Sequence, residues 1–153
     1  MSAGIRLASG LAIADGRALL VASTYASHSQ PLWNLPGGRV APGELLSETV
    51  VREVREETGL TATVNELAYI SESYDGATHV MNATFAIDVR GTIALPKSSD
   101  HIVAVEWVAI DRLASRIAIA VVRDPLMRYL RDRTRYFGVA DAGVTIVWPE
   151  EAG

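Results

Sequence analysis

Residues 38–60 read GRVAPGELLSETVVREVREETGL, a stretch that predicts one helix with an unusual concentration of charge. On a helical wheel of about 100° per residue, apolar side chains recur at i, i+4 and i+8 and form a stripe: Leu46, Val50 and Val54. Glu57 and Glu53 fall on the flank of this stripe, about 20° and 60° from its centre, and Glu56 falls about 120° away. A fully solvated surface would not place carboxylates beside the buried face, so the spacing indicates a functional cluster.

The chemistry of this cluster follows from its ligand type. Neighbouring carboxylates repel one another, and burial adds to the cost of each charge, so a divalent cation would stabilise the group. The stretch contains neither cysteine nor histidine, which favours Mg²⁺, with Mn²⁺ as a second candidate, over zinc. Because Mg²⁺ usually completes its shell with water and substrate phosphates, the cluster points to phosphate or pyrophosphate chemistry. The alternative is an ordinary amphipathic helix with ion pairs such as Glu48–Arg52 and Arg52–Glu56.

The wider pattern resembles the signature of the Nudix hydrolase family, of the MutT-like kind: Gly-x5-Glu-x7-Arg-Glu-U-x-Glu-Glu-x-Gly-U, where U is bulky and aliphatic. All nine specified positions are filled here: Gly38, Glu44, Arg52, Glu53, Val54, Glu56, Glu57, Gly59 and Leu60. A chance match is expected on the order of 10⁻¹⁰ times per starting position. The motif covers 23 of the 153 residues, and the segments 33–37 and 106–108 also resemble the family.

The resemblance implies a fold and a metal site. Composition and element order alone indicate the α+β class, and the family likeness implies an α/β/α sandwich. In it, a mixed β-sheet lies between helices and the motif forms a loop–helix–loop. By the same likeness, Glu53, Glu56 and Glu57 are expected to bind the metal together with a backbone carbonyl of Gly37 or Gly38. We expect these two glycines to adopt backbone conformations that are closed to other residues.

The remaining motif residues receive supporting roles. The resemblance assigns activation of the attacking water to Glu53. Glu44 is expected to support a metal or to act as a base; the alternative is an exposed acid favoured by the helix dipole. We expect Arg52 to orient Glu56 through a charge-assisted hydrogen bond rather than to bind substrate. The resemblance also implies a further metal ligand shortly before Trp107, where Asp100 is the first candidate and His101 the second.

The implied reaction is metal-assisted hydrolysis of a phosphoanhydride bond in a nucleoside diphosphate linked to a further group. The substrate would be a nucleoside triphosphate, an oxidised nucleotide or a nucleotide sugar. One alternative is a pyrophosphohydrolase of RNA 5′ ends, which requires the arginines of residues 111–136 to form a continuous patch beside the metal site. Another is a non-catalytic nucleotide-binding regulatory module, but such modules usually lose motif carboxylates, and this chain retains all of them.

Aromatic residues outside the helix are candidates for stacking on a nucleobase. They are Trp33, Tyr25 and Tyr74. The alternative places Trp33 in the strand core, Tyr25 on the surface and Tyr74 at a hairpin end. The sequence therefore leaves the base and the leaving group open.

Length and composition predict one domain over residues 1–153. The net charge of −4 gives no general attraction to nucleic acid or to an anionic membrane. With no cysteine, thiol catalysis and disulfides are excluded. No apolar run reaches the roughly 20 residues of a membrane span, and no signal peptide is evident. We therefore expect a cytoplasmic protein with a small nucleotide as its partner, and the family likeness allows a homodimer.

Hydrophobic periodicity and turn residues predict the remaining elements. The turns are expected at Asp15-Gly16 and Asp75-Gly76, and a break in the second helical region at Asp124-Pro125. Loops are expected at 24–32 and 91–100. Strands are expected at 5–14, 17–23, 33–35, 62–74, 77–89, 102–109 and 143–148, and helices at 45–58 and 111–136. Pro36, Gly37 and Gly38 are expected to end the short strand before them, and Gly59 to cap the first helix.

Overall fold

The computed structural model describes residues 4–96 and 101–140. Its first element is a hairpin of two strands, β1 (Ile5–Ala14) and β2 (Arg17–Ser23). Asp15 and Gly16 form the tight turn with φ of 52° and 72°, the left-handed conformation that Asp-Gly turns favour. The predicted hairpin is therefore confirmed at its expected residues.

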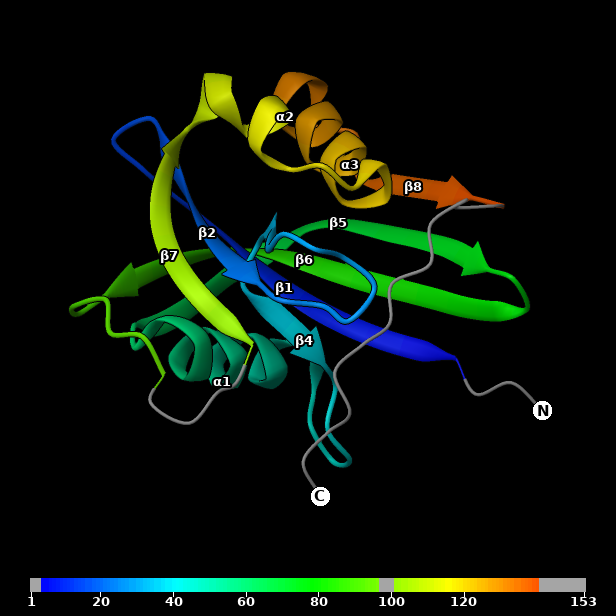
Figure 1. The fold of residues 1–153 in the computed structure, drawn as a ribbon. Helices are drawn as coiled ribbons and strands as arrows, with labels where there is room; N and C mark the ends of the chain where they lie inside the picture. Colours follow the sequence, from blue (N-terminus) through cyan, green and yellow to red (C-terminus); the bar gives the residue numbers. More distant parts are fainter. Residues whose placement is uncertain (1–3, 97–100, 141–153) are drawn as a thin grey trace.

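In the part of the chain that the structure describes, a mixed sheet of eight strands forms the body of the protein (Figure 1). Its path runs β3-β2-β1-β6-β5-β8, while β4 pairs with β1 and β7 pairs with β2. The further strands are β3 (Leu32–Asn34), β4 (Gly37–Arg39), β5 (Thr61–Asp75), β6 (Thr78–Arg90), β7 (Ile102–Ala109) and β8 (Tyr136–Val139). The beginning of β1 has β4 as its neighbour and its end has β2. The sheet therefore forks along β1.

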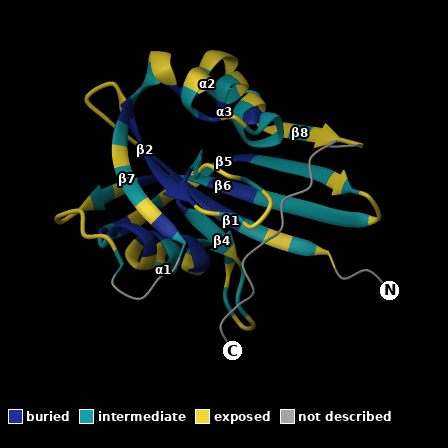
Figure 2. Cartoon of the chain, viewed as in Figure 1, coloured by how far each residue is buried: buried dark blue, intermediate teal, exposed yellow. Residues whose placement is uncertain are grey.

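Helices cover both faces of this sheet. Helix α1 (Leu46–Thr58) lies on one side, and α2 (Leu113–Arg116) and α3 (Ala120–Asp132) lie on the other (Figure 1). One core cluster packs beneath α1 around Val50 and Val54. The second packs beneath α2 and α3 around Leu113 and Leu126. Figure 2 shows the buried segments meeting at the centre of the sheet, between these helical layers. The expected sandwich of helices around a mixed sheet is confirmed.

Helix α1 begins one residue after its expected start and ends where expected. The Glu48 carboxylate accepts the backbone N–H of Leu45, the residue before the helix, at 2.8 Å. Gly59 ends the helix with φ of 78°, and its N–H donates to the Arg55 carbonyl. The expected glycine cap is therefore confirmed.

Other element predictions were wrong. No strand was expected at 37–39, but these residues form β4 because their backbone pairs with β1. The strand before them, β3, does end at Asn34, before Pro36, as expected. The helical region expected at 111–136 consists of a 3₁₀ turn (Ile110–Arg112), α2 and α3, and it is interrupted at 117–119 rather than at Pro125. Residues 136–139 form β8, which pairs in parallel with β5. The strand expected at 143–148 lies outside the described residues.

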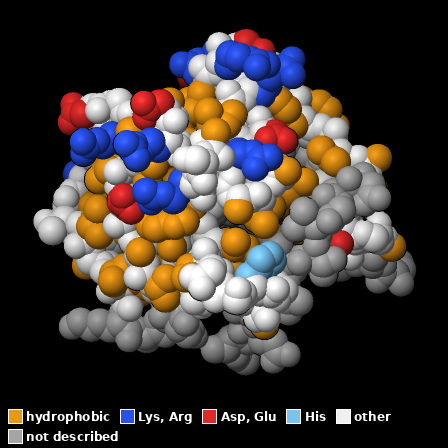
Figure 3. All heavy atoms as spheres, turned by 45° about the horizontal axis from the view of Figure 1, so that its top comes forward, with side chains coloured by type: hydrophobic (Ala, Val, Ile, Leu, Met, Phe, Trp, Pro, Cys, Tyr) orange, Lys and Arg blue, Asp and Glu red, His pale blue; other side chains and the backbone are white. Residues whose placement is uncertain are grey.

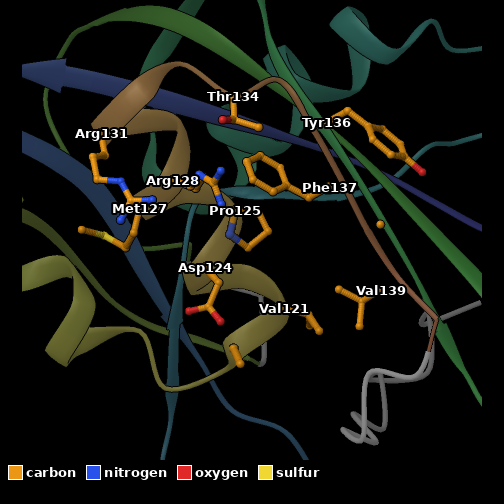
Figure 4. Close-up of a pocket in the computed structure, with 12 residues that line it drawn as sticks. Val121, Asp124, Pro125, Met127, Arg128, Arg131, Thr134, Tyr136, Phe137 and Val139 are labelled. Atoms are coloured by element: carbon orange, nitrogen blue, oxygen red, sulfur yellow. The ribbon is translucent and has the colours of Figure 1, made fainter.

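Pro125 lies inside α3 and is buried there. It has no N–H, so the carbonyl of Val121 loses its usual helical donor. Figure 4 shows both residues lining a cavity of about 850 Å³ between α3 and β8, together with Phe137. This cavity lies on the α3 side of the sheet, away from α1.

Across the two described ranges, no helix combines the length and the apolar composition that crossing a membrane requires.

Candidate functional site

Helix α1 places its carboxylates in the order of burial that the helical wheel predicts. Glu57 is only 6% exposed. The side chain of Glu53 is 15% exposed and that of Glu56 is 58% exposed. The two carboxylates nearest the apolar stripe are thus largely shielded from water. On an ordinary solvated helix face, these carboxylates would be exposed.

Strand β4 brings its two glycines onto these carboxylates. The N–H of Gly37 donates to Glu57 Oε1 at 3.0 Å. A Cβ added at Gly38 would lie 2.6 Å from Glu53 Oε1. Neither glycine has a positive φ, so the expectation of an unusual backbone conformation was wrong. Glycine is required here because its missing side chain lets β4 approach both β1 and the α1 carboxylates.

The buried carboxylate of Glu57 carries the strongest electrostatic perturbation of the site. Burial raises its pKa well above the usual range, and the nearby negative charge of Glu53 raises it further. The hydrogen bond from Gly37 opposes these effects. Among the described residues, no basic side chain forms an ion pair with Glu57, so positive charge at this point would stabilise it.

Arg52 holds the other acids of the motif. Its guanidinium binds both oxygens of Glu44, with Nε 2.6 Å from Oε2 and Nη2 3.0 Å from Oε1. Its Nη1 lies 2.9 Å from Glu53 Oε1 and 3.2 Å from Glu56 Oε2. The expected contact to Glu56 is therefore present, while no ion pair joins Arg52 to Glu48 in the part of the chain that the structure describes.

Glu44 is fully engaged by the protein. Besides Arg52, it accepts hydrogen bonds from the backbone N–H of Ala41 at 2.8 Å and the hydroxyl of Thr49 at 2.9 Å. The hydrogen bond from Arg52 is the main cause that lowers the pKa of Glu44 to about 2, and the Ala41 N–H adds to it. Glu44 thus anchors Arg52. Thr49 was missed by the sequence analysis, although on the helical wheel it lies about 100° from Val50, on the same side of the helix as Glu53 and Glu56.

The donor set fits a hard divalent cation. Glu53 and Glu57 are neighbouring carboxylates, and Gly37 and Gly38 bring a backbone segment against them. Oxygen ligands of this kind suit Mg²⁺ or Mn²⁺. Within residues 4–96 and 101–140, three acidic or histidine side chains do not converge on one point. Arg52 contributes to this arrangement because its guanidinium holds Glu53 and Glu56.

We expect Arg52→Lys to lower the free energy of unfolding by about 1–2 kcal/mol. A lysine ammonium cannot contact both oxygens of Glu44 and also reach Glu53, and the 32% exposure of the arginine side chain moderates the loss. Urea denaturation measures the effect. The matched control is Arg55→Lys, since within the described ranges Arg55 makes a single side-chain hydrogen bond, to Thr61. Equal losses in both variants would contradict this role of Arg52.

The structure does not gather the three aromatic candidates for base stacking. Arg116 covers the ring of Trp33, with its Cζ 4.8 Å from the ring centroid, and the indole packs against the core. Tyr74 is 45% exposed near the end of β5, against the ring of His79. Both positions agree with the alternative interpretation of these residues.

Tyr25 lies close enough to Glu57 for the charge of that carboxylate to act on its hydroxyl. Burial raises the pKa of its hydroxyl; a hydrogen bond with the Ser23 side chain opposes this shift, and the charge of Glu57 adds to it. Tyr25 is therefore half-buried beside the site rather than fully on the surface. Asp100, the expected ligand outside the motif, lies beyond the described residues.

Comparison with known proteins extends the likeness beyond the motif. A family model described as the NUDIX domain matches residues 4–130. The CTP pyrophosphohydrolase of Escherichia coli is 36% identical over 80 residues, which cover 52% of this chain and 59% of that protein. The ADP-ribose pyrophosphatase of Methanocaldococcus jannaschii is 48% identical over 59 residues, covering 37% and 35% of the two chains. The matches thus span less than two thirds of the length of these curated relatives.

The likeness to solved structures covers nearly the whole fold. The crystal structure of a MutT protein from Methanosarcina mazei Go1 is 27% identical in sequence and superposes with a TM-score of 0.73. It covers 88% of this chain and 98% of that one. Since the domain model spans most of the chain and agrees with both the motif and the observed sheet, the protein belongs to the NUDIX domain family.

Proposed function

We propose that this chain is a Mg²⁺- or Mn²⁺-dependent hydrolase of phosphoanhydride bonds in nucleoside diphosphate-linked compounds. The observation that carries the proposal is the buried carboxylate of Glu57 beside Glu53, both set against the glycines of β4. The names of the two curated relatives, a CTP pyrophosphohydrolase and an ADP-ribose pyrophosphatase, support the same reaction class.

The metal would be held by Glu53, Glu56 and Glu57 with a backbone carbonyl of Gly37 or Gly38. Because these three carboxylates do not converge on one point in the described structure, Glu56, the most exposed of them, would have to turn toward the other two. When bound, it would neutralise the diphosphate and lower the pKa of a coordinated water. Burial of Glu57 excludes solvent from one side of this site and strengthens its electrostatic interactions.

Glu53 is the residue to which we assign acceptance of the proton from the attacking water. It faces Gly38 while retaining limited exposure to solvent, so a water molecule can reach it. Glu44 is less suited to this role because Arg52, Ala41 and Thr49 already occupy its oxygens. Arg52 acts as a positioning residue that sets the orientation of Glu53 and Glu56.

A free nucleotide fits the surface better than an RNA end. Arg128 and Arg123 pair with neighbouring acids, and Arg135 donates to backbone carbonyls of β5. On the face shown in Figure 3, Lys and Arg side chains are interspersed with Asp and Glu. Helix α3 also lies across the sheet from α1 (Figure 1), so its arginines do not continue the metal site.

The substrate range is tested by metal-dependent release of phosphate and pyrophosphate from a panel. The panel contains nucleoside triphosphates, oxidised nucleotides, nucleotide sugars and dinucleoside polyphosphates. At least one member should be hydrolysed, and Glu53→Gln should lower that rate by about 10²–10⁴-fold. The control, Glu48→Gln, changes an acid on the same helix whose carboxylate accepts a hydrogen bond from the backbone N–H of Leu45 at the helix N-terminus.

Two outcomes would overturn the proposal. If no compound of the panel were hydrolysed in a metal-dependent manner, the chain would instead be assigned to hydrolysis of RNA 5′ ends or to a non-catalytic binding module. Full activity in Glu53→Gln would reject Glu53 as the proton acceptor. A cytoplasmic location and a homodimer stay predictions.

A further inference from the structure

Three polar side chains form a closed hydrogen-bonded ring on β1 and β6. The hydroxyl of Ser9 donates to Asn82 Oδ1 at 3.2 Å. Asn82 Nδ2 donates to Thr84 Oγ1 at 2.8 Å, and the Thr84 and Ser9 hydroxyl oxygens are 2.8 Å apart. Each member therefore fixes the orientation of the other two. We call this set the Ser9–Asn82–Thr84 ring.

The ring lies on the face of the sheet opposite α1. Successive residues of a strand point to opposite faces, and Ala8 and Ala12 belong to the core beneath α1. Ser9 therefore shares its face with Leu11, which belongs to the core beneath α3. Thr84 also hydrogen-bonds the hydroxyl of Tyr69 on β5; burial raises the pKa of Tyr69 to about 12, and the contact with Thr84 opposes that shift.

The ring is nevertheless adjacent to the proposed metal site. Ser9 is paired with Thr84 on one side and with Gly37 on the other. Gly37 in turn donates its N–H to Glu57. From Gly37 to Thr84 the span is two inter-strand spacings, about 10 Å. Since β4 is an edge strand beside β1 (Figure 1), a ligand at its glycines can extend toward either face.

Burial changes across the ring in a way that leaves one member accessible. Ser9 and Thr84 are buried, whereas Asn82 is half-exposed, as are its register neighbours Leu7 and Ser71. A primary amide has two N–H donors and a carbonyl with two lone pairs. Among the described residues, Asn82 uses one donor in the bond to Thr84 and one lone pair in the bond from Ser9. One N–H and one lone pair remain, on a side chain that the ring holds rigid.

The chemistry of the ring selects the kind of group that it can bind. It contains hydroxyl and amide groups but no cation, so it suits a neutral group rather than a phosphate. An amide that both donates and accepts matches the ring nitrogens, carbonyls and amino groups along the edge of a nucleobase. A site that hydrogen-bonds such groups favours the base whose donors and acceptors match its own over a base that leaves them unpaired.

We propose that Asn82, positioned by Ser9 and Thr84, binds the polar edge of the substrate's nucleobase and determines base selectivity. The diphosphate would then lie at the α1 carboxylates, with β4 between the two contacts. The inference rests on the proposed function and deepens it, because it assigns the nucleoside end of the substrate to the other face of the sheet.

The test compares Asn82→Ala with Asn65→Ala. Asn65 is an exposed asparagine of β5 whose amide donates to Asp88, so it is a matched control outside the ring. kcat/KM is measured for ATP, GTP, CTP and UTP, their 2′-deoxy forms and inorganic triphosphate. Asn82→Ala should lower kcat/KM for the preferred base about tenfold. The ratio of kcat/KM between the preferred base and the others should therefore fall toward one. Turnover of inorganic triphosphate and the Asn65→Ala values should change less than about twofold.

A second measurement separates this inference from the hydrolase assignment. Binding of the four nucleoside monophosphates is followed by NMR titration without metal, in the wild type and in both variants. If no nucleotide is hydrolysed but a base-dependent affinity is lost in Asn82→Ala, the proposed function fails and this inference stands. Three results would overturn the inference. In Asn82→Ala, the ratio of kcat/KM between bases could stay unchanged, or kcat/KM could change only between ribose and deoxyribose forms. The wild type could also bind all four nucleoside monophosphates equally.

Discussion

Replacing Glu57 with glutamine is expected to lower metal-dependent nucleotide hydrolysis by at least about 10²-fold. The substitution keeps the size of the side chain but removes the negative charge that would hold the cation. The hydrogen bond from the Gly37 N–H to Oε1 is retained, since the amide oxygen accepts as the carboxylate does. Glu66→Gln, on exposed surface of β5, is the control.

The same substitution should not destabilise the protein. Burial and the Glu53 charge raise the pKa of Glu57 because both disfavour its ionised form. A neutral glutamine avoids that cost, so the melting temperature in the presence of a chelator should equal or exceed that of the wild type. Near-normal activity in Glu57→Gln would reject the metal assignment. Lost activity together with a markedly lower melting temperature would instead show a structural role.

Replacing Gly37 with alanine is expected to lower the free energy of unfolding by about 3 kcal/mol. The added Cβ would lie 2.4 Å from the carbonyl oxygen of Ala8 and 2.7 Å from the Cα of Ser9. Both are backbone atoms of β1, so no side-chain rotation can relieve the overlap. Strand β4 would have to separate from β1 and would weaken the contact to Glu57. Chemical denaturation measures the loss.

Gly38→Ala is the informative comparison for this prediction. Its Cβ would meet the Glu53 carboxylate at 2.6 Å, and that carboxylate is the far end of a flexible side chain. The loss of stability should therefore stay within about 1 kcal/mol, while activity falls because Glu53 is displaced. If the two alanine variants were equally stable, the steric account of Gly37 would be rejected.

Local pattern was sufficient for the elements whose residues interact over short distances. The hydrophobic period of α1 gave its boundaries to within one residue and the order of burial of Glu57, Glu53 and Glu56. Turn chemistry gave the hairpin at Asp15-Gly16. These predictions succeeded because the helical period and the turn conformation are properties of neighbouring residues.

Predictions failed where distant segments decide the structure. Strand β4 contains two glycines in three residues and is a strand only because β1 lies beside it. Strand β8 likewise depends on β5. Pro125 lies within α3, although it cannot donate the helical hydrogen bond to Val121, and it is buried. None of these partners is near in sequence, so periodicity and propensity could not indicate them.

The sequence by itself determined the family, the helix that carries the carboxylates, and the type of ion that they suit. Only the tertiary structure decided that Gly37 is required by its approach to β1 rather than by its φ. It also decided that Arg52 holds Glu44 as well as Glu56. The structure alone placed Ser9 and Asn82, 73 residues apart, in one hydrogen-bonded ring. Ligand type is a property of residue identity, whereas these contacts depend on how strands far apart in the chain pair, which no local pattern encodes.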